Sequence, residues 1–97
     1  MTKDELKIKL VKLATTEAKK NHRQFAHDAQ KDLSELVSSG VERMFAEGKA
    51  EREEIDLAEE NIRHFINKMC EKDRSAVINA RVFARARLTI CPIWPFC

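Results

Sequence analysis

The histidines and cysteines, which are the usual zinc ligands, are few and widely spaced. They are His22, His27, His64, Cys70, Cys91 and Cys97. Zinc sites are built from close pairs such as C-x2-C or H-x3-H, whose two ligands converge from one turn. His22 and His27 are five residues apart and would diverge around a helix, as would His64 and Cys70. We therefore expect no metal and no cofactor.

Covalent catalysis by a thiol needs an oriented base beside an activated thiolate. Cys70 follows Met69 at the end of an apolar stripe, a position typical of a buried structural thiol. The chain has no glycine-rich phosphate loop and no nucleophile elbow, and 97 residues leave little room for a core and a catalytic cleft. The sequence predicts that the protein is not an enzyme.

The carboxyl end combines residue types that bind other proteins. Residues 90–97 carry no charge and hold both prolines and the only tryptophan. Proline cannot continue a helix, and the run is too short to cross a bilayer, which takes about 20 apolar residues. We predict an extended apolar tail that is available to another molecule. Two alternatives stay open: the tail caps the core of its own bundle, or Cys91 pairs with Cys97.

Arginines precede this tail, and residues 74–97 contain four of them and no acid. Arginine and tryptophan are enriched at interface hot spots. We expect this protein to dock on a larger protein complex. The arginines would orient it there through charge-assisted hydrogen bonds, and the apolar side chains would fill pockets of the complex. The predicted partner-binding residues are Arg81, Arg85, Arg87, Ile93, Trp94, Pro95 and Phe96. Because X-Pro bonds isomerise slowly, a prolyl isomerase acting at Pro92 or Pro95 is a further expected partner.

Two other functions fit parts of the chain. The arginine-rich last helix, together with the basic residues 19–23, could neutralise phosphates in a nucleic-acid-binding regulator. Sixteen acids and a net charge of only +2 weigh against that function. The chain could also be a precursor peptide whose last seven or eight residues form a modifiable core.

Composition indicates the fold class. The chain is 35% charged, with two glycines, two prolines and no tyrosine, which is typical of long surface-exposed helices. We predict an all-α fold, a small bundle of three to four helices. It would form one domain over residues 1–89, followed by the extended tail at 90–97.

Caps and periodicity place the helices at about 3–18, 23–47, 51–72 and 76–88. Thr2 to Glu5 fits a capping box that starts the first helix at Lys3, and Gly48 is a stop signal. Dimerisation through the apolar stripe from Phe25 to Phe45 is an open alternative. Acids crowd residues 51–60, which hold six acids and one base.

Residues 76–89 are ambiguous. Val77, Ala80, Ala84 and Leu88 make a helical stripe, but apolar residues also alternate with polar ones as in a strand. We expect a helix, because a lone strand would have no partner elsewhere in this chain and alanine favours helix. Asp73 or Ser75 is the expected cap.

The amino end lacks the apolar stretch of a secretory signal, and no segment resembles a membrane span. We therefore expect a cytoplasmic protein with no membrane partner.

The ends of the chain carry a resemblance. The lysine-rich start Met1-Thr2-Lys3-Asp4-Glu5-Leu6-Lys7, the charged helical middle and the end Ile90-Cys91-Pro92-Ile93-Trp94-Pro95-Phe96-Cys97 resemble small early proteins of lambdoid phages, of the anti-RecBCD type. The resemblance implies a phage protein in the host cytoplasm that docks on RecBCD and redirects this recombination nuclease, without catalysis of its own. No motif carries a functional residue over.

Overall fold

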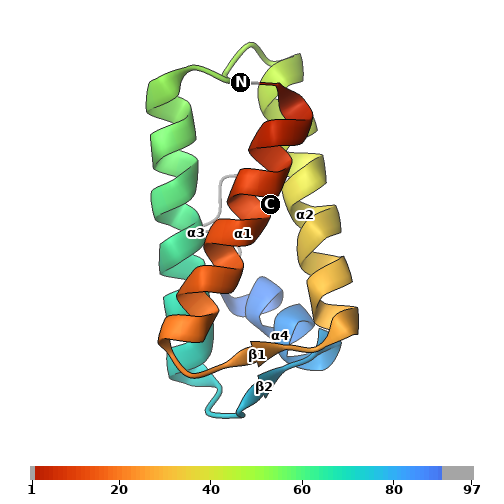
Figure 1. The fold of residues 1–97 in the computed structure, drawn as a ribbon, viewed down its shortest axis with the longest axis vertical. Helices are drawn as coiled ribbons and strands as arrows, with labels where there is room; N and C mark the ends of the chain where they lie inside the picture. Colours follow the sequence, from red (N-terminus) through yellow and green to blue (C-terminus); the bar gives the residue numbers. More distant parts are fainter. Residues whose placement is uncertain (1, 91–97) are drawn as a thin grey trace.

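The computed structural model describes residues 2–90 as a small all-α bundle with one short strand pair (Figure 1). The predicted fold class is confirmed. The elements are α1 (Lys3–Lys20), β1 (Gln24–Phe25), α2 (His27–Ala46), α3 (Arg52–Lys72), β2 (Val77–Ile78) and α4 (Ala80–Ile90).

Local signals set the ends of the first three helices. The Thr2 hydroxyl accepts a hydrogen bond from the Glu5 amide at 3.2 Å, so α1 begins where the capping box predicts. After α2, Gly48 adopts φ +69°. The Lys49 amide donates to the Met44 carbonyl at 2.8 Å and the Gly48 amide to that of Phe45 at 3.2 Å, a Schellman motif. The predicted stop at Gly48 is confirmed.

The connection from α1 to α2 differs from the prediction. A helix was expected from residue 23, but the chain turns at His22, which has φ +57°, and forms β1 before α2 begins at His27. β1 pairs in parallel with β2, and Ala26 donates to the Ile78 carbonyl at 2.8 Å. The backbone groups of residues 24–26 are thus satisfied by a segment about fifty residues later, which no local pattern reveals.

The same pairing corrects the start of the last helix. Residues 77 and 78 belong to β2, so α4 begins at Ala80 and not at 76. Its cap is Asn79, whose side-chain oxygen accepts from the Val82 amide at 3.0 Å, in place of the expected Asp73 or Ser75. A strand does have a partner in this chain, contrary to the expectation, although each strand is only two residues long.

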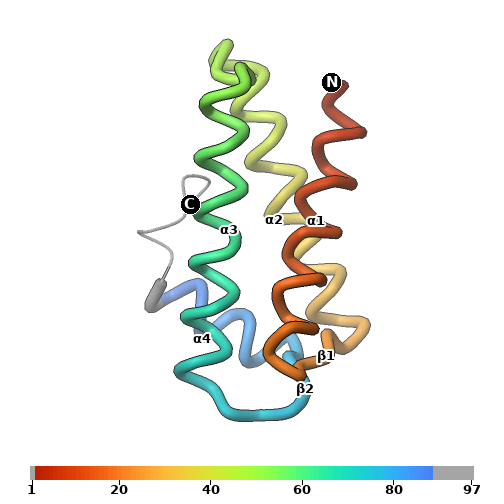
Figure 2. Tube along the Cα trace, turned by 60° about the vertical axis from the view of Figure 1, so that its left-hand side comes forward, coloured from red at the N-terminus to blue at the C-terminus, as the bar shows by residue number. Residues whose placement is uncertain are grey.

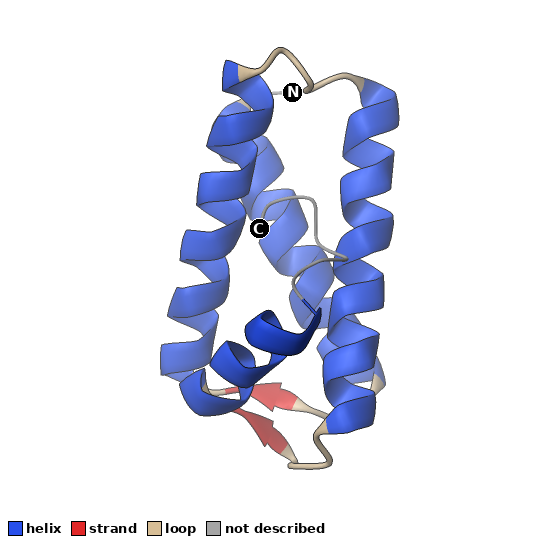
Figure 3. Ribbon diagram, turned by 180° about the vertical axis from the view of Figure 1, so that it is seen from behind, coloured by secondary structure: helices blue, strands red, loops and turns tan. Residues whose placement is uncertain are grey.

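The helices pack in layers around one core. α2 and α3 stand on opposite sides of the bundle, with α1 packed against both on one face and α4 packed against both on the other (Figures 1 and 3). Figure 2 shows α1 and α4 separated by the rest of the bundle. The largest fully buried side chains come from all four helices: Phe65, Phe83, Leu6, Leu10, Leu33, Ile62, Ile66, Met69, Val37 and Val41.

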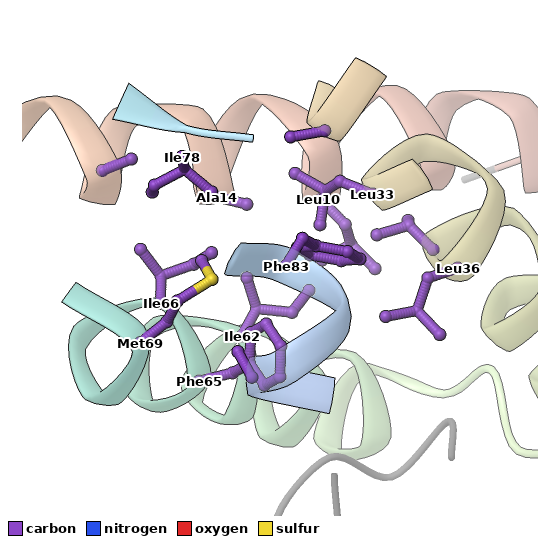
Figure 4. Close-up of a cluster of buried hydrophobic side chains, with 14 of the residues drawn as sticks. Leu10, Ala14, Leu33, Leu36, Ile62, Phe65, Ile66, Met69, Ile78 and Phe83 are labelled. Carbon is purple, nitrogen blue, oxygen red and sulfur yellow. The ribbon is translucent and has the colours of Figure 1, made fainter. Parts of the chain in front are cut away.

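Phe83 is the largest side chain that α4 contributes to this core (Figure 4). Its ring is 0% exposed and meets the ring of Phe65 edge to face, with centroids 5.8 Å apart and planes at 69°. Edge-to-face geometry places the positive ring edge on the negative ring face, which adds to the gain from burial. This pair locks α4 against α3.

The apolar stripe of α2, which the sequence offered as a contact for a homodimer, lies largely inside the monomer. Its core members, Leu33, Val37 and Val41, are fully buried in the core of the monomer. They are therefore unavailable to a second copy. Any self-association must use another face.

Candidate functional site

The outer face of α4 carries the predicted arginines. Val82, Phe83 and Ala86 are buried, and these positions fix which side of the helix faces the core. Arg81, Ala84, Arg85 and Leu88 then fall at i, i+3, i+4 and i+7 on the opposite side, and all four are exposed. We call these four residues the α4 face.

This arrangement reverses the expected phase of the helix. Ala84 and Leu88 were placed on an inward stripe, but both face solvent, and the side chain of Leu88 is 86% exposed. The core instead takes Val82 and Phe83, because the two bulkier side chains bury more apolar surface. An apolar side chain consequently stands beside two guanidinium groups on the surface.

One arginine of the α4 face has an acidic neighbour. The guanidinium of Arg85 lies 3.8 Å from the Asp73 carboxylate, in the turn that leads into β2. Hydrogen bonds from Ser75, with the Arg85 charge as a smaller contribution, hold the pKa of Asp73 below its ordinary value. Asp73 therefore stays ionised near neutral pH and orients Arg85 without covering it, since 66% of the Arg85 side chain is exposed.

The other predicted site residues are distributed as follows. Arg87 is exposed and flanks the α4 face, and none of the ion pairs within residues 2–90 involves Arg81 or Arg87. Ile93, Trp94, Pro95 and Phe96 lie outside the described residues, as do Pro92 and the cysteines at 91 and 97. The structure thus shows the part of the predicted surface that α4 supplies.

Cys70 is the free cysteine within the described residues, and it is buried. Burial raises the pKa of its thiol, because a thiolate loses solvation there, and the nearby Arg23 opposes that shift only in part. The thiol is therefore protonated near neutral pH. Within residues 2–90, no three side chains of His, Cys, Asp or Glu lie together as metal ligands would.

Sequence reasoning missed a groove between α1 and α2. One section, of about 500 Å³, is lined by Ile8 and Lys12 among others, and the next, of about 680 Å³, by Lys19 and Arg23. Both sections share Thr15, so they are continuous. The available signal was Ile8, a large apolar residue off the buried stripe of α1, which is 69% exposed.

Comparisons with known protein families, with curated proteins and with solved structures found no match to this chain. Each helix within residues 2–90 falls short of the length or apolar content that crossing a membrane requires.

Proposed function

We propose that this protein is a non-enzymatic adaptor that docks on a larger protein assembly through the α4 face and the chain that follows it. The observation that carries the proposal is the exposure of Leu88 beside Arg81 and Arg85, on a helix whose other side is locked in the core by Phe83. A rigid helix that carries an apolar side chain and guanidinium groups on one exposed face loses little entropy on binding. It suits an acidic surface with an apolar pocket.

The resemblance to anti-RecBCD phage proteins directs the first test to one assembly. We propose RecBCD as that assembly, with the protein acting in the cytoplasm of a phage-infected cell. The tail residues Ile93, Trp94, Pro95 and Phe96 would extend the contact beyond α4, and an X-Pro bond at Pro92 or Pro95 would be the substrate of a prolyl isomerase.

Nucleic-acid binding has weaker support. Arg23 of the first basic segment and Arg85 of α4 both interact electrostatically with the Asp73 carboxylate, so an acidic side chain interrupts the positive charge of the two segments. Asp73 beside Arg85 would also repel a phosphate backbone. DNA affinity that falls steeply between two salt concentrations would reverse this preference.

The decisive experiment measures affinity for immobilised, purified RecBCD. Reversing both charges, Arg81→Glu with Arg85→Glu, should weaken binding about thirtyfold or more, as loss of hot-spot residues does. Leu88→Asp should have a similar effect. The matched control is Arg52→Glu, an exposed arginine at the far end of α3 from α4, which should bind like the wild type (Figure 1).

Two results would contradict the proposal. If the α4 variants bind RecBCD as tightly as the wild type, the α4 face is not the docking surface. If the wild type does not bind, RecBCD is not the partner. A truncation after residue 90 should also lose binding while its circular dichroism stays helical, and a collapse of the helical signal would assign the tail to the core.

A further inference from the structure

The groove is lined by residues of α1 and α2, and α1 lies across the bundle from α4 (Figures 1 and 3). None of the residues lining either section is acidic. Lys12 and Lys19 are exposed and take part in no ion pair with the described residues. Lys7, in contrast, is held by Glu42 at 2.8 Å. The groove therefore presents positive charge around an exposed isoleucine, Ile8.

A complementary surface lies on α3. Asp56, Leu57 and Glu60 are exposed, with Leu57 at 55%, and neither acid takes part in an ion pair within residues 2–90. Glu59 instead turns toward α1 and holds Lys9 at 2.8 Å. We call Asp56, Leu57 and Glu60 the α3 acidic face. It is an apolar side chain between carboxylates, the inverse of the groove.

The groove and the α3 acidic face lie on the two sides of α1 at similar levels. α1 and α3 run in the same direction, with α2 on one side of α1 and α3 on the other (Figure 1). The Lys9–Glu59 ion pair fixes the level: residues 56–60 of α3 stand beside the part of α1 that contains Ile8 and Lys12.

We propose that the groove binds the α3 acidic face of a second copy of this chain. In this dimer the twofold axis runs parallel to α1 and passes in front of it, in the view of Figure 1. The rotation places α3 of one copy opposite the groove beside α2 of the other copy, at the same height along α1. Leu57 then meets Ile8, and Asp56 and Glu60 meet Lys12. Each contact forms twice, so the assembly closes as an isologous dimer.

Charge distribution favours a second copy over other occupants. The chain has 18 basic and 16 acidic residues, and a net charge of +2. Within residues 2–90, unpaired lysines lie along the groove and unpaired carboxylates on the α3 acidic face, so these two surfaces attract each other. Self-association covers Ile8 and Leu57 at once, whereas a nucleic acid or another acidic protein would cover only the groove. The dimer does not depend on the proposed function and leaves both α4 faces open on its outer sides.

The test measures the dimer dissociation constant by sedimentation equilibrium, with a reductant present to exclude disulfide-linked species. Lys12→Glu should raise the constant about tenfold or more, because two attractive contacts become repulsive in each dimer. Glu60→Lys should do the same, and the two together should restore the wild-type value. The control is Lys31→Glu, the same charge change at an exposed site outside the groove lining, which should leave the constant unchanged.

A second measurement locates the contact. Zero-length crosslinking of a mixture of isotope-labelled and unlabelled protein should join Lys12 of one copy to Glu60 or Asp56 of the other, seen as mixed-isotope peptides. A chain that stays monomeric up to about 1 mM overturns the proposal, as does a dimer that Lys12→Glu leaves intact. Neither result bears on RecBCD binding, which is measured with α4 variants.

Discussion

Replacing Phe83 by alanine should detach α4 from the bundle. The ring is 0% exposed, and truncating a buried phenylalanine costs about 3–5 kcal/mol. Part of this cost is the edge-to-face contact with Phe65, which contributes about 0.5–1.5 kcal/mol beyond burial. A domain of this size has an unfolding free energy of about 5–15 kcal/mol, so Phe83→Ala would remove a large share.

Urea unfolding followed by circular dichroism measures this loss. With a urea slope of about 1–3 kcal/mol per molar, a loss of about 3–5 kcal/mol in Phe83→Ala should lower the midpoint by about 1–5 M. Phe83→Leu, which keeps most of the apolar volume but loses the ring contact, should cost less. The matched surface control is Leu88→Ala, which should change stability by no more than about 0.5 kcal/mol. The reasoning fails if Phe83→Ala costs less than about 1 kcal/mol, or if Leu88→Ala costs as much as Phe83→Ala.

Three further predictions concern the turns and the buried thiol. Gly48→Ala should destabilise the protein by about 1–2 kcal/mol, because alanine is strained in the left-handed conformation that Gly48 adopts. A steric clash adds nothing, since no atom lies within 4 Å of the added Cβ. Gly48→Asn should cost less in the same urea assay, because asparagine tolerates this conformation better. The pKa of Asp73 is lowered in the folded state, so its stabilising contribution is present above its unfolded pKa and is lost as pH falls through the folded pKa. In an NMR titration, Ser75→Ala should raise the folded pKa of Asp73, because it removes the hydroxyl that donates to the carboxylate. An unchanged pKa would contradict the assigned cause. Cys70 should alkylate far more slowly in the native protein than in urea, as peptide mass spectrometry would show, and equal rates would contradict its burial.

The candidate surfaces were only partly visible in the sequence. Arg81 and Arg85 could be assigned to the surface by residue type, because a guanidinium is rarely buried without a partner. Their apolar neighbour Leu88 could not, since a stripe at helical spacing is ordinarily the buried side. The groove was missed for a related reason: Ile8 departs from the stripe of α1, but one exposed isoleucine means little until α2 is known to lie beside it.

The sequence by itself determined the all-α class and the bounds of α1 and α3 to within about two residues. Thr2, Gly48 and the apolar periodicity act through hydrogen bonds and side-chain spacings of a few residues, which are legible along the chain. Only the tertiary structure decided that residues 24–25 and 77–78 pair, and which side of α4 faces inward. Both depend on contacts between segments far apart in the sequence, where the energy of burying Phe83 against Phe65 outweighs the weak local preference of an alanine-rich stripe.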